Sequence, residues 1–128
     1  TCVVVSPIVP MTKTDVGFEC VSIKDNKPFS YKLVSNHMKD KSKLVSAFHV
    51  ISEKKLVNPT LELDYDIFVC GDDNESVQVV NGLIDEIKGL RSIYLGPIEL
   101  SYLAEMSTPL LLNAMIRNKI KNPGIKII

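Results

Sequence analysis

One stretch in the second half of the chain restricts the fold more than any other. Ile67–Cys70 is a short continuous apolar run, as the buried strands of parallel sheets are. The helical repeat that follows predicts an amphipathic helix, with apolar residues at Val77, Val80, Leu83, Ile84 and Ile87. Gly89 ends this helix, and Ser92–Leu95 predicts the next strand, closed by Gly96-Pro97. Strands that alternate with helices favour an α/β fold with a mostly parallel sheet and flanking helices.

The polar sequence GDDNES lies between that strand and helix, where phosphate-binding loops occur in α/β folds. Two aspartates would repel a phosphate, and the glycine spacing of a dinucleotide loop is absent. Helix capping by Asp72 or Asp73 is the favoured interpretation, and the Asp72–Glu75 spacing predicts a capping box. Binding of a divalent metal by the two aspartates is the alternative.

The first half of the chain predicts further short elements. In order, they are a buried strand Cys2–Val5, an edge strand Phe18–Ile23 after a turn at Gly17, a helix Phe29–Lys41, a strand Leu44–Phe48 and one helical turn Val50–Leu56. Residues 57–64, which include Pro59, predict a connection. Asp64 and Asp66 are interpreted as solvated loop carboxylates.

The last long segment, Glu99–Asn118, is apolar nearly all round in its middle. Such a helix is buried in a core or against another subunit. A Thr-Pro pair suits a helix start, so we expect a break near Thr108-Pro109, with Thr108 as N-cap and Pro109 as first helical residue.

Composition narrows the function classes. Basic and acidic residues balance at 15 each, so no net field favours nucleic acid or anionic lipid. No apolar run approaches the roughly 20 residues that span a bilayer. Three scattered cysteines indicate reduced thiols in a cytosolic protein and no metal site.

His49 is the main candidate for a functional side chain. It follows the expected strand Leu44–Phe48, and ligands of open α/β sheets bind beyond the carboxyl ends of the strands. The rigid loop SPIVP, residues 6–10, follows another strand and is expected to line the same crevice. A hydrogen-bonded core histidine is the alternative. His37 is expected at the surface.

Five segments in this order resemble F420-dependent NADP reductases, the archaeal NADPH:coenzyme F-420 oxidoreductases: SPIVP, VSAFHVIS, DYDIFVCGDD, LGPIELSYLAEMSTPLLLNAMIRNK and GIKII. The resemblance covers nearly the whole chain. It implies a partial Rossmann-like sheet, with residues 1–128 as a single α/β unit of late Rossmann strands and a C-terminal deazaflavin-binding region. The chain has no GxGxxG loop and opens without methionine, so we expect that it lacks the N-terminal half that holds most of the NADP site.

The resemblance also implies a set of site residues. Those that match the deazaflavin pocket are Pro7, Val9, His49, Ile51 and Thr108, with Ser6, Tyr102 and Met106 as further candidates. His49 would bond the polar edge of the deazaflavin, and Ile51 would support the ring. Tyr102 stands where a relative has arginine, and Met106 replaces a small hydroxyl residue, so contacts to the polar tail of the cofactor differ here.

The implied function is hydride transfer between the reduced 8-hydroxy-5-deazaflavin coenzyme and NADP, by a cytoplasmic enzyme that forms a homo-oligomer through its C-terminal helix. The cofactors carry this chemistry, so no catalytic side chain and no metal is expected. The alternatives are a non-catalytic binding or dimerisation module, or a related NAD(P)-dependent reductase domain. A longer gene product that starts with a GxGxxG loop would favour the enzyme.

Overall fold

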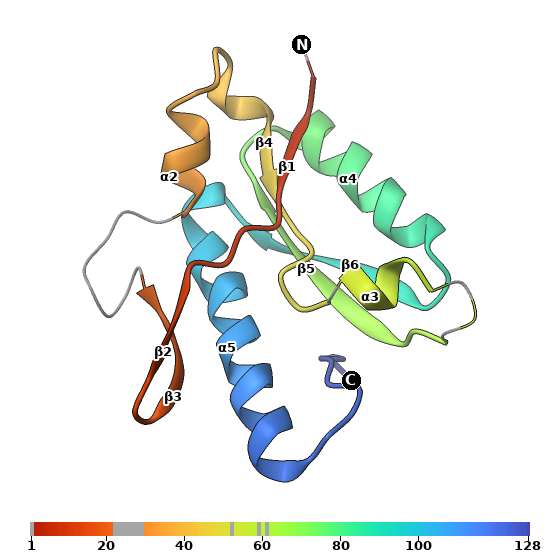
Figure 1. Ribbon diagram of the computed structural model, residues 1–128. Coiled ribbons are helices and arrows are strands. Elements are labelled where there is room, and N and C mark those ends of the chain that lie inside the picture. Colours follow the sequence, from red (N-terminus) through yellow and green to blue (C-terminus); the bar gives the residue numbers. More distant parts are fainter. Residues whose placement is uncertain (1, 22–29, 52, 59, 61) are drawn as a thin grey trace.

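Four short apolar runs form the main sheet of the computed structural model, which describes residues 2–21, 30–51, 53–58, 60 and 62–128. The strands are β1 (Val4–Ser6), β4 (Leu44–Ser46), β5 (Tyr65–Gly71) and β6 (Leu90–Gly96), in that order across the sheet (Figure 1). β1 pairs with β4, and β5 with β6, in parallel. The predicted α/β fold with a mostly parallel sheet is confirmed, but β4 and β5 are antiparallel.

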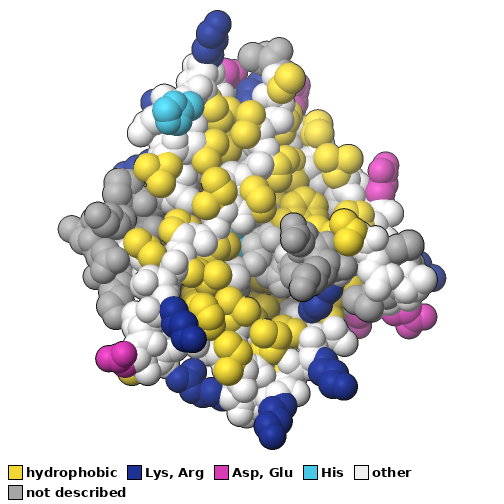
Figure 2. Space-filling view, in the orientation of Figure 1, with side chains coloured by type: hydrophobic (Ala, Val, Ile, Leu, Met, Phe, Trp, Pro, Cys, Tyr) yellow, Lys and Arg dark blue, Asp and Glu magenta, His cyan; other side chains and the backbone are white. Residues whose placement is uncertain are grey.

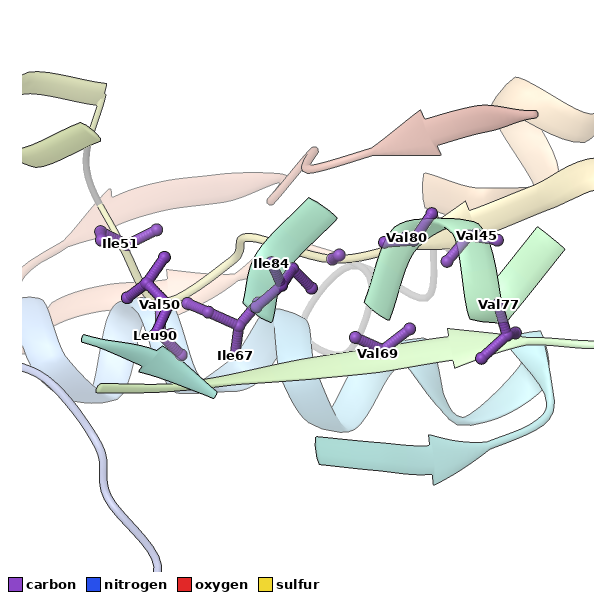
Figure 3. Packing of buried hydrophobic residues seen from close by; sticks show 10 residues of the cluster. Val45, Val50, Ile51, Ile67, Val69, Val77, Val80, Ile84 and Leu90 are labelled. Carbon is purple, nitrogen blue, oxygen red and sulfur yellow. The ribbon is translucent and has the colours of Figure 1, made fainter. Parts of the chain in front are cut away.

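The helix α4 (Asn74–Glu86) covers one face of this sheet. Its buried residues Val77, Val80 and Ile84 join a core cluster with Val45 of β4 and with Ile67 and Val69 of β5. Figure 3 shows Ile84 beside Ile67, and Val50 beside Leu90 at one end of the cluster. The cluster thus reaches from the centre of the sheet to the chain that follows β4.

Asp73 is the N-cap of α4, and its carboxylate accepts a hydrogen bond from the Ser76 backbone N–H at 3.1 Å. The predicted capping of the helix is confirmed, but the Asp72–Glu75 capping box is wrong. The helix begins one residue later than that spacing assumed, and Asp72 instead accepts a hydrogen bond from the Ile98 N–H. Within the described ranges, no three His, Cys, Asp or Glu side chains gather as metal ligands would.

A second buried cluster, Leu44, Cys70 and Ile98, lies against the opposite face of the sheet. Successive strand residues point to opposite faces, so Leu44 and Val45 of β4 belong to different clusters. The helices on this side are α2 (Ser30–Ser35), η2 (Ile98–Leu100) and α5 (Ser101–Asn118), and the short η1 (Lys41–Lys43) directly precedes β4. The expected helix Phe29–Lys41 is therefore shorter than predicted, and Phe29 lies outside the described residues.

α5 is one helix from Ser101 to Asn118, with Pro109 inside it. The predicted break near Thr108-Pro109 is wrong, and Thr108 does not start a helix. A proline in a helix interior costs about 3 kcal/mol. Pro109 itself and residues before it, including Ala104 and Ser107, are buried, and Leu111 after it is half-buried, so packing offsets this cost. The Thr108 hydroxyl is instead directed to another segment, as the site below shows.

A hairpin of β2 (Met11–Thr14) and β3 (Gly17–Cys20) lies beside α5 (Figure 1). Asn113 of α5 joins them like a further strand, because its side chain accepts from the Phe18 N–H at 2.9 Å and donates to the Phe18 carbonyl at 2.8 Å. The edge strand was expected at Phe18–Ile23, and Ile23 lies outside the described residues. β2 was not predicted.

The C-terminal segment is bound to β5 through Asp66. This carboxylate is fully buried, accepts two hydrogen bonds from the cross-strand Arg91 at 2.8 Å, and accepts another from the Ile127 N–H at 2.6 Å. The prediction of a solvated Asp66 is wrong because β5 begins earlier than expected, at Tyr65, and pairs Asp66 with Arg91. Asp64 is exposed, as predicted, and pairs with Lys126.

Three smaller expectations have mixed outcomes. Cys2 is exposed and precedes β1, which starts at Val4, so the first strand is shifted and only partly buried. The helical turn after β4 is α3 (Glu53–Leu56). The connection at 57–64 is confirmed for the residues described there, which exclude Pro59.

In the part of the chain that is described, no helix combines the length and the apolar character of a membrane span.

Candidate functional site

The chain turns sharply where β4 ends, and this turn places His49. Phe48 has a φ of 67°, in the left-handed region that residues with a side chain rarely adopt. Such a conformation costs of order 1–3 kcal/mol and persists where the surrounding structure imposes it. Here it directs His49, Val50 and Ile51 into the interior, where all three are buried.

His49 is only 5% exposed, and its Nδ1 has no hydrogen-bond partner among the described residues. Burial lowers the pKa of His49 to about 4, so the imidazole is neutral at pH 7. A neutral imidazole offers one N–H donor and one acceptor nitrogen. The alternative, a core histidine whose ring is hydrogen-bonded within the protein, therefore does not hold for Nδ1. This atom remains able to bond a ligand. His37 is exposed, as predicted.

Thr108 of α5 holds the turn from the other side, because its hydroxyl donates a hydrogen bond to the His49 backbone carbonyl. This bond joins positions 59 residues apart and fixes α5 against the loop after β4. The Thr-Pro pair thus has a role that sequence reasoning misassigned to helix initiation.

Two adjoining cavities share His49, Ile51 and Thr108 as a common wall. The first, which we call the apolar lobe, has a volume of about 380 Å³ and is lined by Pro7, Val9, Phe48, His49, Ile51, Leu56 and Thr108. The second, the basic lobe, has a volume of about 410 Å³ and is lined by His49, Val50, Ile51, Lys55, Thr108, Leu111, Leu112, Met115, Lys121 and Pro123. Each lobe has mostly apolar walls, and none of the described residues that line it is acidic.

The apolar lobe brings together all five principal residues of the sequence-based site, Pro7, Val9, His49, Ile51 and Thr108. The three further candidates lie elsewhere. Ser6 is buried at the end of β1 and does not line either lobe. Met106 lines a separate cavity of about 330 Å³ between α5 and the hairpin. Tyr102 is half-buried on α5 and lines none of these three cavities.

Sequence reasoning missed the basic lobe and one buried carboxyl. Lys55 lies on α3, whereas Lys121 and Pro123 lie in the segment after α5, two parts of the chain whose meeting no local pattern indicates. Glu105 is fully buried on α5, accepts a hydrogen bond from the Ser30 hydroxyl, and its Oε2 has no partner among the described residues. Burial raises its pKa to about 7. The feature of the sequence that could have indicated this buried carboxyl is a lone glutamate within an apolar helix.

The apolar lobe suits a flat ring with one polar edge. Its walls are aliphatic and aromatic, and the buried Nδ1 of His49 is a polar atom that the described residues leave unpaired. A buried polar group without a partner is costly, so a ligand that bonds it gains affinity. The residues present therefore fit a deazaflavin, which offers aromatic faces and a polar edge.

The resemblance read from the sequence is confirmed by comparison with curated proteins, although no family model matches the chain. The F420-dependent NADP reductase of Methanocaldococcus jannaschii is 41% identical over 96 residues, which are 75% of this chain and 43% of that protein. The enzyme of the same name from Methanothermobacter thermautotrophicus is 35% identical over 67% of this chain and 37% of its own length. This chain thus matches about two fifths of these relatives.

A solved structure supports the same architecture. The crystal structure of a candidate F420-dependent NADP-reductase from Arthrobacter sp. FB24 superposes with a TM-score of 0.74 and covers 97% of this chain and 56% of that one. At 18% identity, this likeness shows the fold alone. Together with the curated relatives, it identifies the chain as a homologue of part of the F420-dependent NADP reductases.

Proposed function

We propose that this chain is the deazaflavin-binding part of an enzyme that transfers hydride between the reduced 8-hydroxy-5-deazaflavin coenzyme F420 and NADP. The observation that carries the proposal is the apolar lobe, which Pro7, Val9, His49, Ile51 and Thr108 line together, and His49 has a buried Nδ1 that the described residues leave unpaired. The names of the curated relatives support it. They favour this reading over a non-catalytic module or another type of reductase.

In this proposal, the residues of the chain bind and orient the deazaflavin ring and exclude water from the site. Pro7, Val9 and Ile51 contact the faces of the ring, and His49 Nδ1 bonds its polar edge. Thr108 is a positioning residue, because its hydroxyl holds the His49 carbonyl. The bound deazaflavin and nicotinamide supply the hydride chemistry, which needs close contact of about 3–3.5 Å and a dry site rather than an acid or base.

NADP is the proposed second cofactor, held mostly by residues outside this chain, because the 128 residues contain no GxGxxG loop. We propose that residues 1–128 form one α/β unit of such an enzyme. Three free thiols, with Cys20 and Cys70 buried and Cys2 exposed, support a reducing, cytoplasmic location.

A fluorescence titration of the chain with coenzyme F420, and separately with NADPH, tests the proposal. We expect saturable binding of F420 and weak or no binding of NADPH. His49→Ala should weaken F420 binding by about 1–3 kcal/mol, the cost of losing a buried hydrogen bond. His37→Ala is the matched control, because the second histidine of the chain is exposed. Absence of F420 binding, or an equal effect of both substitutions, would contradict the proposal.

We also propose that α5 forms a contact with a second copy of the chain. Leu103, Met106 and Leu110 lie at helical spacing on α5 and are 47%, 41% and 62% exposed. In Figure 2 hydrophobic side chains extend down this face over the region of α5. Large exposed apolar patches mark association sites. Light scattering should give twice the mass of the chain, and Leu110→Glu should halve it, whereas Val79→Glu, at an exposed position of α4, should not.

A further inference from the structure

The loop of residues 6–10 supplies Pro7 and Val9 to the apolar lobe, and a side-chain hydrogen bond holds it in the middle. Backbone hydrogen bonds join its two ends to the residue after β4 and to the residue after β3. Between these ends, the Ile8 carbonyl accepts a hydrogen bond from the Ser30 hydroxyl of α2, with 3.4 Å between the two oxygens. Because Pro7 and Val9 flank Ile8 in the chain, this middle bond helps to position both residues.

The Ser30 hydroxyl has a second acceptor, Oε1 of Glu105 on α5, so α2, α5 and the loop meet here (Figure 1). A serine hydroxyl has one proton to donate, and the two acceptors compete for it. The contact with Glu105 is the closer of the two, whereas 3.4 Å is long for a hydrogen bond between two oxygens, which is usually about 2.7–2.8 Å. Ser30 is therefore directed mainly to Glu105 and only weakly to Ile8.

The protonation state of Glu105 decides this competition. A carboxylate only accepts hydrogen bonds, but a protonated carboxyl also donates one. An ionised Glu105 thus holds the Ser30 proton, and its charge strengthens that bond at the expense of the bond to Ile8. A protonated Glu105 can instead donate to the Ser30 oxygen, which leaves the Ser30 proton for the Ile8 carbonyl. The two protonation states therefore differ in how firmly the loop is held.

The surroundings of Glu105 allow both states. Burial raises its pKa to about 7, and its Oε2 has no hydrogen-bond partner among the described residues. The titratable groups that face it are the Tyr31 hydroxyl of α2 and the Cys70 thiol of β5. Burial, and after it nearby carboxylates that include Glu105, raise the pKa of both groups, that of Cys70 to about 11. Both groups are therefore neutral at pH 7 and favour neither state of Glu105.

No lysine or arginine among the described residues forms an ion pair with Glu105. Other charged groups lie on the elements that contact α5, but they are directed elsewhere. Glu99 of η2 is exposed, and Glu19 of β3 lines the cavity between α5 and the hairpin. On β5, Asp66 is paired with Arg91. Glu105 therefore titrates without a fixed counter-charge, and its negative charge appears as the pH rises through about 7.

We propose that Glu105 is a positioning residue that controls the loop of residues 6–10: when protonated it lets Ser30 hold the Ile8 carbonyl, and when ionised it draws Ser30 away. A loosened loop no longer fixes Pro7 and Val9 at the apolar lobe, so the affinity for the deazaflavin should fall as the pH rises through about 7. This effect on affinity rests on the function proposed above, whereas the response of the loop does not.

The response of the loop can be measured without any ligand. Ile8-Val9 is the one Ile-Val pair in the chain, so labelling of isoleucine with ¹³C at the carbonyl and of valine with ¹⁵N gives a single correlated NMR signal. The carbonyl carbon reports on hydrogen bonding to its own oxygen. In the wild-type chain we expect the Ile8 signal to shift as the pH is raised from about 5 to about 9, with its midpoint at about 7.

Two variants separate this relay from a general effect of pH. Glu105→Gln stays neutral and its amide can donate to Ser30, so the Ile8 signal should remain at its low-pH position. Ser30→Ala keeps the Glu105 carboxyl but removes the hydroxyl, so the signal should remain near its high-pH position. Glu86→Gln, at an exposed position of α4, is the matched control and should titrate as the wild type does. If Ser30→Ala does not fold, the wild type and Glu105→Gln decide the test.

The effect on the ring site is measured by titration with coenzyme F420 at about pH 5.5 and about pH 8.5. The dissociation constants of the wild type and Glu105→Gln should be similar at the lower pH. At the higher pH the wild type should bind about fivefold more weakly than Glu105→Gln, the effect of one hydrogen bond of about 1 kcal/mol. Because both proteins are titrated with the same coenzyme, any titration of the coenzyme itself affects them equally.

The possible failures can be told apart. An Ile8 signal that does not shift over this pH range, or that shifts equally in Glu105→Gln, would overturn the control of the loop by Glu105. An Ile8 signal that titrates while the ratio of the two dissociation constants stays constant would overturn the effect on the ring site. Failure of both proteins to bind F420, with an Ile8 signal that titrates, would contradict the proposed function and not the response of the loop.

Discussion

The Thr108 hydroxyl on α5 donates a hydrogen bond to the backbone carbonyl of His49, and this bond ties the longest helix to the turn after β4. The same two residues form part of the wall between the apolar and basic lobes. The helix and the loop therefore position the site together, and a change in either is expected to alter stability and binding at once.

Thr108→Val tests this connection, because valine has the shape of threonine but no donor. We expect a loss of about 1 kcal/mol in the free energy of unfolding, the usual net value of a hydrogen bond, together with weaker F420 binding. Urea denaturation and a fluorescence titration measure the two effects. Thr108→Ser keeps the hydroxyl and should retain most of the stability and most of the F420 affinity. If it behaves like Thr108→Val, the loss of the hydrogen bond is not the cause of the two effects.

His49 should make stability depend on pH in mildly acidic solution. Its pKa is about 4 in the folded chain and about 6.5 when exposed, so between these values the unfolded chain binds a proton that the folded chain does not. The contribution of His49 to the free energy of unfolding is thus complete above pH 6.5 and declines as the pH falls toward 4.

His49→Gln removes that titration, so the difference in unfolding free energy between wild type and variant should shrink as the pH falls from about 7 to 4.5. Urea denaturation at several pH values measures it, with His37→Gln as the exposed control. A constant difference across this window would mean that His49 is not held neutral by burial.

Glu105 has the opposite effect on the pH dependence of stability. Burial raises its pKa to about 7 from 4.5, so the folded chain keeps a proton that the unfolded chain releases between these values. Its contribution to the free energy of unfolding therefore falls as the pH rises from 4.5 to 7. Glu105→Gln stays neutral, so its stability relative to wild type should be greater at pH 8 than at pH 5. Glu99→Gln, at an exposed position, is the matched control.

The sequence contained enough information for most of the main sheet and for the α4 helix. Period-3.6 spacing from Val77 to Ile84 and a continuous run at Ile67–Cys70 have few other solutions, so both elements were predicted, although β5 extends beyond the predicted run at both ends. Pro7, Val9, His49, Ile51 and Thr108 came from resemblance to a family, and the structure brings them to one cavity.

The features that could not be predicted depend on distant contacts. Asp66 looked solvated because its neutralising partner, Arg91, lies 25 residues away. The Thr-Pro pair has the local signature of a helix start, but the burial of Pro109 and of the residues before it carries α5 through the proline. The basic lobe needs three segments to meet, and local propensity holds no information about such a meeting.

The Asp66–Arg91 pair also holds the C-terminal segment, which supplies Pro123 to the basic lobe. We expect Asp66→Asn to lower the free energy of unfolding by about 2 kcal/mol, since it removes charge-assisted hydrogen bonds from a buried acceptor. The Ile127 amide should then exchange hydrogen faster. Asp64→Asn is the matched control, because this exposed pair with Lys126 should contribute less than about 1 kcal/mol. Equal effects of the two variants would contradict this role of Asp66.

The most direct test of the proposed site is nitrogen NMR of the two histidines during addition of coenzyme F420. The chain has only His37 and His49, so both imidazoles can be assigned, and His37 serves as an internal control. We expect the Nδ1 signal of His49 to shift as the coenzyme binds, whereas the signals of exposed His37 should not move. Unchanged His49 signals at saturating coenzyme would show that the ring binds elsewhere and would contradict the proposed site.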